Sequence, residues 1–193
     1  MHREVSEYVL FVMTITLQKK ATAIHEAGHA VIAISQGLAI TQISIHPDED
    51  YRGVVVHPPL PDSVTDKIHP QFNRDKQRLA FEARAITSLA GAVAEFEYYR
   101  VIGSPKSKRW LTTNSGARSD RAQAARLIVR LASSDEELKA YVDWLFIRTQ
   151  NTVKHLLHWH AIEAVQDALL QHTTLTGKDV KEIYRDAFKI QSR

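Results

Sequence analysis

Cysteine is absent from this chain of 193 residues, which excludes disulfide bonds and thiolate metal ligands. The absence is compatible with a reducing compartment, and we expect a cytoplasmic location. The apolar run at residues 8–17 has about ten residues and no signal-peptide cleavage site, whereas a membrane-spanning helix needs about 20 apolar residues. We therefore expect no transmembrane segment. Residues 1–18 are interpreted as a lead-in, either a strand or disordered, with Met13 as an alternative start.

The composition is that of a globular protein with enough apolar material for one core, at 44% hydrophobic and 24% charged residues. We expect a single domain over residues 19–193. The net charge is +3, and basic side chains concentrate between residues 100 and 130. This basic stretch has no interleaved aromatic residue apart from Trp110 and no nucleic-acid-binding signature. It is interpreted as a solvated face, and no nucleic-acid partner is expected.

A motif of the form H-E-x-x-H occupies positions 25–29, with His25, Glu26 and His29 as its fixed members. Residues four apart on a helix lie on the same face, so the two imidazoles can bind one cation while Glu26 reaches a metal-bound water. The motif lies in a predicted helix that begins near Lys19 and ends at Gly37. This helix is apolar on nearly every side and is therefore predicted to be buried. The alternative is a pair of core histidines hydrogen-bonded to carbonyls, with Glu26 at the surface.

The rest of the pattern predicts a mainly α fold with a small β-sheet. Two strands, at residues 40–46 and 53–57, are joined by a polar loop. A zincin-like motif helix and this strand pair would precede a C-terminal helical bundle that starts at about residue 73. Apolar spacing and capping residues predict helices at 73–101, from 116–119 to 132, from 134 to about 155, at 160–171 and at 178–188, with a loop at 103–115 and a turn at 174–177.

A zinc site needs at least one further protein ligand. An extension of the motif to a third histidine is excluded, because the required positions hold Ile32 and Ser35. Glu49 stands at a suitable distance along the chain but lies in the loop between the two strands. The remaining candidates are carboxylates on later helices, namely Glu95, Glu97 and Asp120.

An ordered series of segments resembles the peptidase domain of FtsH-type zinc proteases. These segments are His25–Ala30, the strand that opens with Gly53, Leu89–Glu95, Thr113–Asp120 and Leu169–Gly177. The family's Gly-Gly-Arg-x-Ala-Glu run is replaced here by Ala-Gly-Ala-Val-Ala-Glu. The family's Thr-Gly-Ala-x-Asn-Asp run is replaced by Ser-Gly-Ala-Arg-Ser-Asp. The resemblance covers most of residues 20–190 and is more specific than the histidine motif alone.

The resemblance implies that a single Zn²⁺ binds this chain and that Asp120 is its third ligand, with Glu95 orienting a ligand histidine. Glu97 is interpreted as an ordinary surface residue. Substrates would be peptides or unfolded proteins. They would add to the edge strand formed by Gly53, Val54, Val55 and Val56.

The family also carries an ATP-driven unfolding module, whereas this sequence has no G-x-x-x-x-G-K-[ST] loop. The resemblance therefore leaves room for a separate ATPase partner. It also suggests a homo-oligomer, because the family forms rings.

Two functions from different classes are compatible with the sequence. The first is a zinc metalloendopeptidase that cleaves unstructured polypeptides by Glu26-assisted attack of a zinc-bound water. The second is a catalytically silent metal-binding module whose basic stretch contacts a partner. The other histidines are expected to be solvent-facing or local hydrogen-bond partners rather than a second metal site; among them are His57, His155, His158 and His160.

Overall fold

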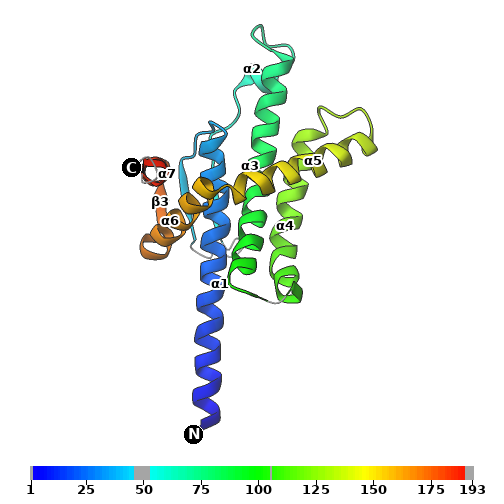
Figure 1. The fold of residues 1–193 in the computed structure, drawn as a ribbon. Coiled ribbons are helices and arrows are strands. Elements are labelled where there is room, and N and C mark those ends of the chain that lie inside the picture. Colours follow the sequence, from blue (N-terminus) through cyan, green and yellow to red (C-terminus); the bar gives the residue numbers. More distant parts are fainter. Residues whose placement is uncertain (1, 46–52, 105, 190–193) are drawn as a thin grey trace.

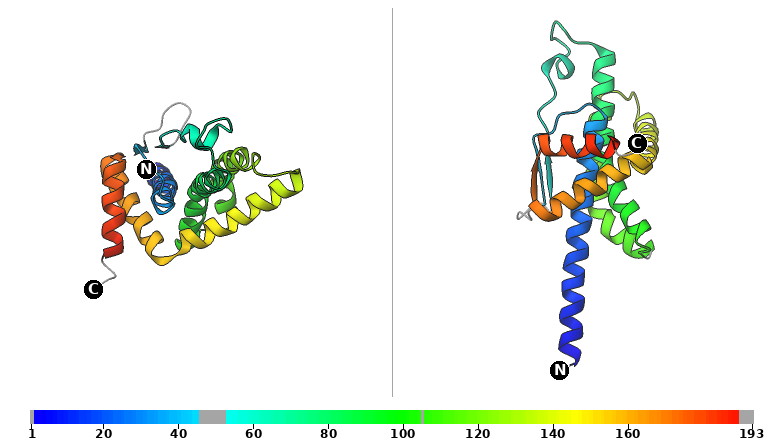
Figure 2. Two further views of the ribbon diagram at one scale, coloured as in Figure 1. Left: turned by 90° about the horizontal axis from the view of Figure 1, so that it is seen from above. Right: turned by 60° about the vertical axis from the view of Figure 1, so that its left-hand side comes forward.

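The computed structural model describes residues 2–45, 53–104 and 106–189, with side chains over 17–45, 53–104 and 116–189. It is mainly helical with one small antiparallel sheet, which confirms the predicted fold class. Figure 2 shows α1 between α3 and α4 on one side and α6 and α7 on the other. The helices are α1 His2–Ser35, α2 Asp62–Thr65, α3 Arg74–Val101, α4 Lys106–Ile128, α5 Asp135–Lys154, α6 Leu156–His172 and α7 Gly177–Lys189, and the strands are β1 Gln42–Ser44, β2 Val54–Val56 and β3 Thr174–Thr176.

Helix α1 is longer than the sequence predicted. It runs without interruption from His2, so the expected lead-in with a strand and the helix start near Lys19 are wrong. No proline or glycine interrupts residues 2–27, and a continuous helix satisfies every backbone group along the way. Figure 1 shows the N-terminal part of α1 extending beyond the other elements. The predicted end is confirmed, because Gly37 adopts a positive φ of 74° that terminates the helix.

The sheet has the strand order β2-β1-β3, and both pairs are antiparallel. The predicted pairing of the first two strands is confirmed, with Ile43 opposite Val55. The predicted turn at 174–177 is wrong: Thr174–Thr176 is β3, and its Leu175 lies opposite Ile43 and is buried. Three residues are too few to show an alternating pattern, so no strand could be predicted there. The order leaves β2 at an edge of the sheet, where Val54 and Val56 are 42% and 43% exposed.

Two helices of the bundle, α3 and α5, begin at residues whose side chains cap them. The Asn73 side chain accepts a hydrogen bond from the Lys76 amide at the start of α3, and the Ser134 side chain accepts one from the Glu137 amide at the start of α5. Helix α4 starts ten residues earlier than the predicted 116, so the expected loop at 103–115 is largely helical. Among the described helices, none has both the length and the hydropathy required to cross a membrane.

The contact between α1 and α3 is unusually close and depends on small residues. A Cβ atom on Gly28 would lie 2.6 Å from the Ala94 Cβ and 2.9 Å from the Ala90 carbonyl oxygen. Alanine at positions 27, 30, 90 and 94 is fully buried in the same region. The backbones of the two helices can therefore approach only while these positions stay small.

We predict that Gly28→Val lowers the free energy of unfolding by about 2 kcal/mol or more, because the added carbons must push α3 away from α1. Urea denaturation monitored by circular dichroism measures this change. Lys19→Val, at an exposed position of the same helix, is the control and should cost roughly half a kcal/mol from helix propensity alone. Equal losses in the two variants would contradict the close contact.

Candidate metal centre

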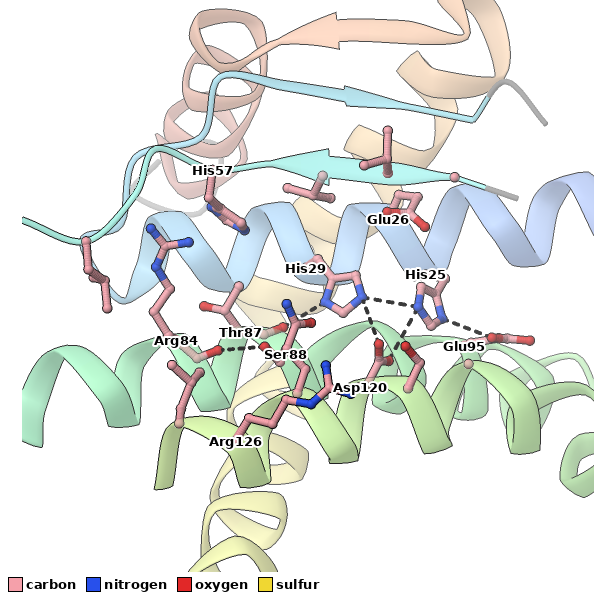
Figure 3. A pocket seen from close by; sticks show the side chains of 18 of the residues that line it. His25, Glu26, His29, His57, Arg84, Thr87, Ser88, Glu95, Asp120 and Arg126 are labelled. Carbon is pink, nitrogen blue, oxygen red and sulfur yellow. Dashed lines mark hydrogen bonds and ion pairs between the residues drawn. The ribbon is translucent and has the colours of Figure 1, made fainter. Parts of the chain in front are cut away.

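His25 and His29 lie one turn apart on α1, in the part of the helix that contacts α3 (Figure 3). Their rings form a T-shaped pair with centroids 4.8 Å apart and an interplanar angle of 77°. The two Nε2 atoms are 3.1 Å apart and face the same space. The spacing predicted from the sequence therefore brings both imidazoles together.

The other nitrogen of each ring is held by α3. The Nδ1 atom of His29 lies 2.7 Å from the carbonyl oxygen of Thr87, and that of His25 lies 3.0 Å from Oε2 of Glu95. A carbonyl and a carboxylate only accept hydrogen bonds, so each Nδ1 carries a proton and donates it. In the neutral form of each ring, Nε2 is then an unprotonated nitrogen available to a cation.

Asp120 brings a carboxylate to this space from α4. Its Oδ2 lies 3.5 Å from Nε2 of His25, and its Oδ1 lies 3.7 Å from Nε2 of His29. Asp120 is 7% exposed, and its buried Oδ2 has no hydrogen-bond partner among the described residues. One ligand atom from each of His25, His29 and Asp120 lies within 4.8 Å of the others. These three residues could hold a metal ion, and two imidazole nitrogens with one carboxylate oxygen suit Zn²⁺.

Gly91 provides the room for a cation between the two rings. A Cβ atom at this position would lie 2.6 Å from Nε2 of His25 and closer still to Nε2 of His29. Gly116, on α4, leaves similar room, because a Cβ there would lie 3.1 Å from Cε1 of His25. The two glycines thus leave space beside the imidazoles, and a bound metal ion would need such space.

Glu26 stands beside this cluster and is 6% exposed. Burial raises its pKa, and the nearby His29 and His25 oppose the rise. Gly53, just before β2, permits its position: a Cβ there would lie 2.7 Å from Oε1 of Glu26. A buried carboxyl group with a raised pKa, next to a candidate cation site, is suited to accepting and donating a proton.

The charge around His25 is strongly negative. Burial alone would lower its pKa, but the hydrogen bond that His25 donates to Glu95 and the charges of Asp120 and Glu26 outweigh burial and raise the pKa to about 9. The same carboxylates attract a metal cation. A proton on Nε2 and a metal ion compete for one lone pair, so metal binding at this site must release the proton.

A pocket of about 1120 Å³ opens onto the cluster. One wall is β2 with the segment that follows it, and the others are α1, α3 and α4. The metal candidates and Glu26 line the pocket together with Gly53, Val54, Val55 and His57. Burial lowers the pKa of His57, although its Nδ1 is 3.1 Å from the Ala39 carbonyl oxygen.

Five predicted site residues therefore meet in one place: His25, Glu26, His29, Glu95 and Asp120. Glu97 does not join them. It was expected at the surface but is 5% exposed and accepts a hydrogen bond of 2.9 Å from Nε of Arg100 on the same helix. The surface expectation was wrong because Glu97 faces the bundle. Glu49 lies outside the described residues.

Sequence reasoning missed the contribution of Thr87 to the site. Thr87, Gly91 and Glu95 are each four residues apart, so they form one stripe along α3 opposite the His25–His29 stripe of α1. The matching spacing on the two helices was the available signal. This spacing can be interpreted only if α1 and α3 are known to pack together, and no local sequence pattern reveals that contact.

No protein-family model matches the chain. The class of protein that resembles it is a zinc protease: the chain is 25% identical, over 186 residues, to "ATP-dependent zinc metalloprotease FtsH 3" of Symbiobacterium thermophilum. The match covers 86% of this chain and 29% of the relative. The chain therefore spans less than a third of the length of the relative, whose ATP dependence is a property of a longer protein.

We predict that Asp120→Ala lowers bound metal well below the parent level after equilibration with one equivalent of Zn²⁺, because only two ligands remain. Elemental analysis after gel filtration measures the ratio. Asp143→Ala is the control, since Asp143 pairs with Lys139 and Arg121 on the surface and does not touch the cluster. Full retention of metal in Asp120→Ala would exclude Asp120 as a ligand.

A second variant separates metal binding from folding. Gly91→Ala should keep the fold, because the gain of about 1 kcal/mol in helix propensity over glycine offsets part of the cost of displacing the imidazoles from their hydrogen bonds to Thr87 and Glu95. Its Cβ nevertheless occupies the space between the rings, so bound zinc should fall as in Asp120→Ala. Thermal unfolding and elemental analysis of the same sample test both statements, and normal metal content would contradict the assignment.

Proposed function

We propose that this chain is a zinc-dependent endopeptidase that hydrolyses peptide bonds in unstructured polypeptides. The supporting observation is the convergence of His25, His29 and the orphaned carboxylate oxygen of Asp120, with Glu26 beside them. A bound Zn²⁺ supplies a Lewis acid that polarises a carbonyl and makes water a stronger acid. The similarity to a zinc metalloprotease is in accord with this activity.

In this proposal the chain's own residues position and move protons. Glu26 accepts the proton of the attacking water and returns it to the leaving amine. Its raised pKa suits both steps, since the group must be able to hold a proton as well as release it. Thr87 and Glu95 fix the two imidazole rings through their Nδ1 atoms and so keep Nε2 directed at the cation site.

The edge strand β2 is the proposed substrate-binding element. Val54 and Val55 line the pocket, and β2 has a partner strand only on its β1 side among the described residues. An extended peptide can therefore add to the free edge and bring its backbone past Glu26, which lies next to Gly53. Backbone hydrogen bonds tolerate many sequences but require an unfolded segment.

Folded substrates would have to be unfolded before they could add to β2. The relative is named as ATP-dependent, whereas the present sequence contains no G-x-x-x-x-G-K-[ST] loop. We propose that substrates reach the pocket either already unstructured or from a separate ATPase. Self-association into an oligomer and a cytoplasmic location stay predictions.

We predict that Glu26→Gln lowers cleavage of unfolded casein by about 100-fold or more, the usual contribution of a general base, while bound zinc is unchanged. Release of fluorescent fragments from labelled casein measures the rate. A chelator should abolish the parent's activity, and added Zn²⁺ should restore it. Glu163→Gln, at an exposed position of α6, should behave like the parent. Equal activity in Glu26→Gln and the parent would remove Glu26 from the mechanism.

The second candidate function is a metal-binding module without turnover, which contacts a partner through the basic stretch. That surface is partly neutralised: Arg100 pairs with Glu97, and Arg121 pairs with Asp143. Bound zinc with no cleavage of any unstructured substrate would favour this function. Arg118→Ala and Arg121→Ala would then have to weaken binding of the partner.

A further inference from the structure

The pocket beside the metal centre has an uneven distribution of charge. Its acidic lining residues in the described part of the chain are Glu26, Glu95 and Asp120, which lie in or beside the candidate metal site. Among the residues that the structure describes, the rest of the lining has no acidic side chain and has three arginines, Arg84, Arg126 and Arg130. Figure 3 shows Arg84 on α3 and Arg126 on α4 projecting from two different walls of the pocket.

Arg84 is held with one of its donors unused. Its Nη2 donates a hydrogen bond to the carbonyl oxygen of Pro58, which follows β2. Its Nε is buried and has no hydrogen-bond partner among the described residues. A buried N–H without an acceptor costs free energy, so an acceptor brought by a ligand would be favourable at this position.

Arg126, on α4, and Arg130, just beyond the end of α4, are also without an acidic partner in the described part of the chain. The guanidinium of Arg130 lies 5.7 Å from the centre of the Phe81 ring, which restrains its direction. Neither Arg126 nor Arg130 forms an ion pair with a described carboxylate, although other arginines of the protein do, such as Arg100 and Arg121. The pocket thus contains arginine side chains whose charge no described carboxylate neutralises.

We infer that this arginine group binds a carboxylate of the substrate, so that the pocket prefers a peptide with negative charge close to the bond that is cut. The inference rests on the proposed function and adds a substrate class to it. Guanidinium groups are well suited to carboxylates, because each offers parallel N–H donors to two oxygens. A phosphate group would also attract arginine, but an unmodified polypeptide substrate carries carboxylates and no phosphate.

The carboxylate has two sources, an acidic side chain or the C-terminus of the peptide. A set of short fluorescent peptides distinguishes them. All share one neutral sequence that is acetylated at its N-terminus. One series has an amidated C-terminus and a single Glu moved along the chain, each matched to a peptide with Gln at that position. A further peptide is neutral but has a free C-terminal carboxylate.

Binding is measured by fluorescence anisotropy with the zinc-loaded Glu26→Gln protein, so the result does not depend on turnover. At one position at least, the Glu peptide should bind about 10-fold more tightly than its Gln match, the size of a charge-assisted hydrogen bond. The preference should weaken in high salt. A preference confined to the free C-terminus would identify that carboxylate as the ligand.

Removal of the arginines should abolish the preference. Arg126→Gln is at an exposed helix position and should fold normally. Arg84→Gln tests the buried donor, and metal content reports whether that variant keeps its site. Arg185→Gln, on α7 and outside the pocket lining, removes one charge elsewhere and should retain the full preference.

Two results would overturn the inference. One is equal affinity for Glu, Gln and free-carboxylate peptides, including the absence of binding to any of them. The other is a preference that survives both Arg126→Gln and Arg84→Gln. Cleavage by the parent protein is followed in parallel. Binding that depends on the arginines without cleavage would refute the peptidase proposal alone, and cleavage of Glu and Gln peptides at equal rates would refute the charge preference alone.

Discussion

The close approach of α1 and α3 is the constraint on which the candidate site depends. Gly28 lets the two backbones come together at Ala90 and Ala94, and the same approach brings Thr87 and Glu95 within hydrogen-bond distance of His29 and His25. A wider separation would leave both Nδ1 atoms without an acceptor, and the rings would lose their fixed orientation. The small residues between α1 and α3 therefore also determine how the candidate metal ligands are oriented.

The packing of α1 and α3 also concentrates ionisable side chains at the candidate site. Three carboxyl groups and two imidazoles lie together in a mostly buried region, where uncompensated charge is expensive. Hydrogen bonds satisfy the Nδ1 side of each ring, but Oδ2 of Asp120 has no partner among the described residues. A divalent cation would offset the repulsion between the carboxylates and satisfy this oxygen. Glu26, separated from the ligand atoms, would still be free to exchange protons with solvent in the pocket.

Local sequence pattern was sufficient for some parts of this structure and insufficient for others. The spacing of His25, Glu26 and His29 predicts a shared face, because a helix fixes it within two turns. Asp120 is brought to the cluster only by the packing of α4, so the residues alone left it among several carboxylates and the family resemblance selected it. The starts of α1 and α4 were misplaced because apolar or basic composition was given more weight than the absence of helix breakers. Glu97 was misjudged since an acidic residue on a helix looks the same in sequence whether or not it faces the bundle.

The central strand β1 is joined on one side by β2, its neighbour along the chain, and on the other by β3, which is synthesised far later. A two-stranded ribbon is marginally stable in water by itself, and the third strand adds the Thr174–Ser44 hydroxyl contact and the bond from the Ile45 amide to the Thr173 carbonyl. The sheet that supports the edge strand β2 is consequently complete only after the chain has been made as far as Thr176. During translation, the histidine motif is therefore made long before the sheet that supports the proposed substrate-binding strand β2 is complete. The topology thus delays the assembly of the cleft until almost all of the described domain has left the ribosome.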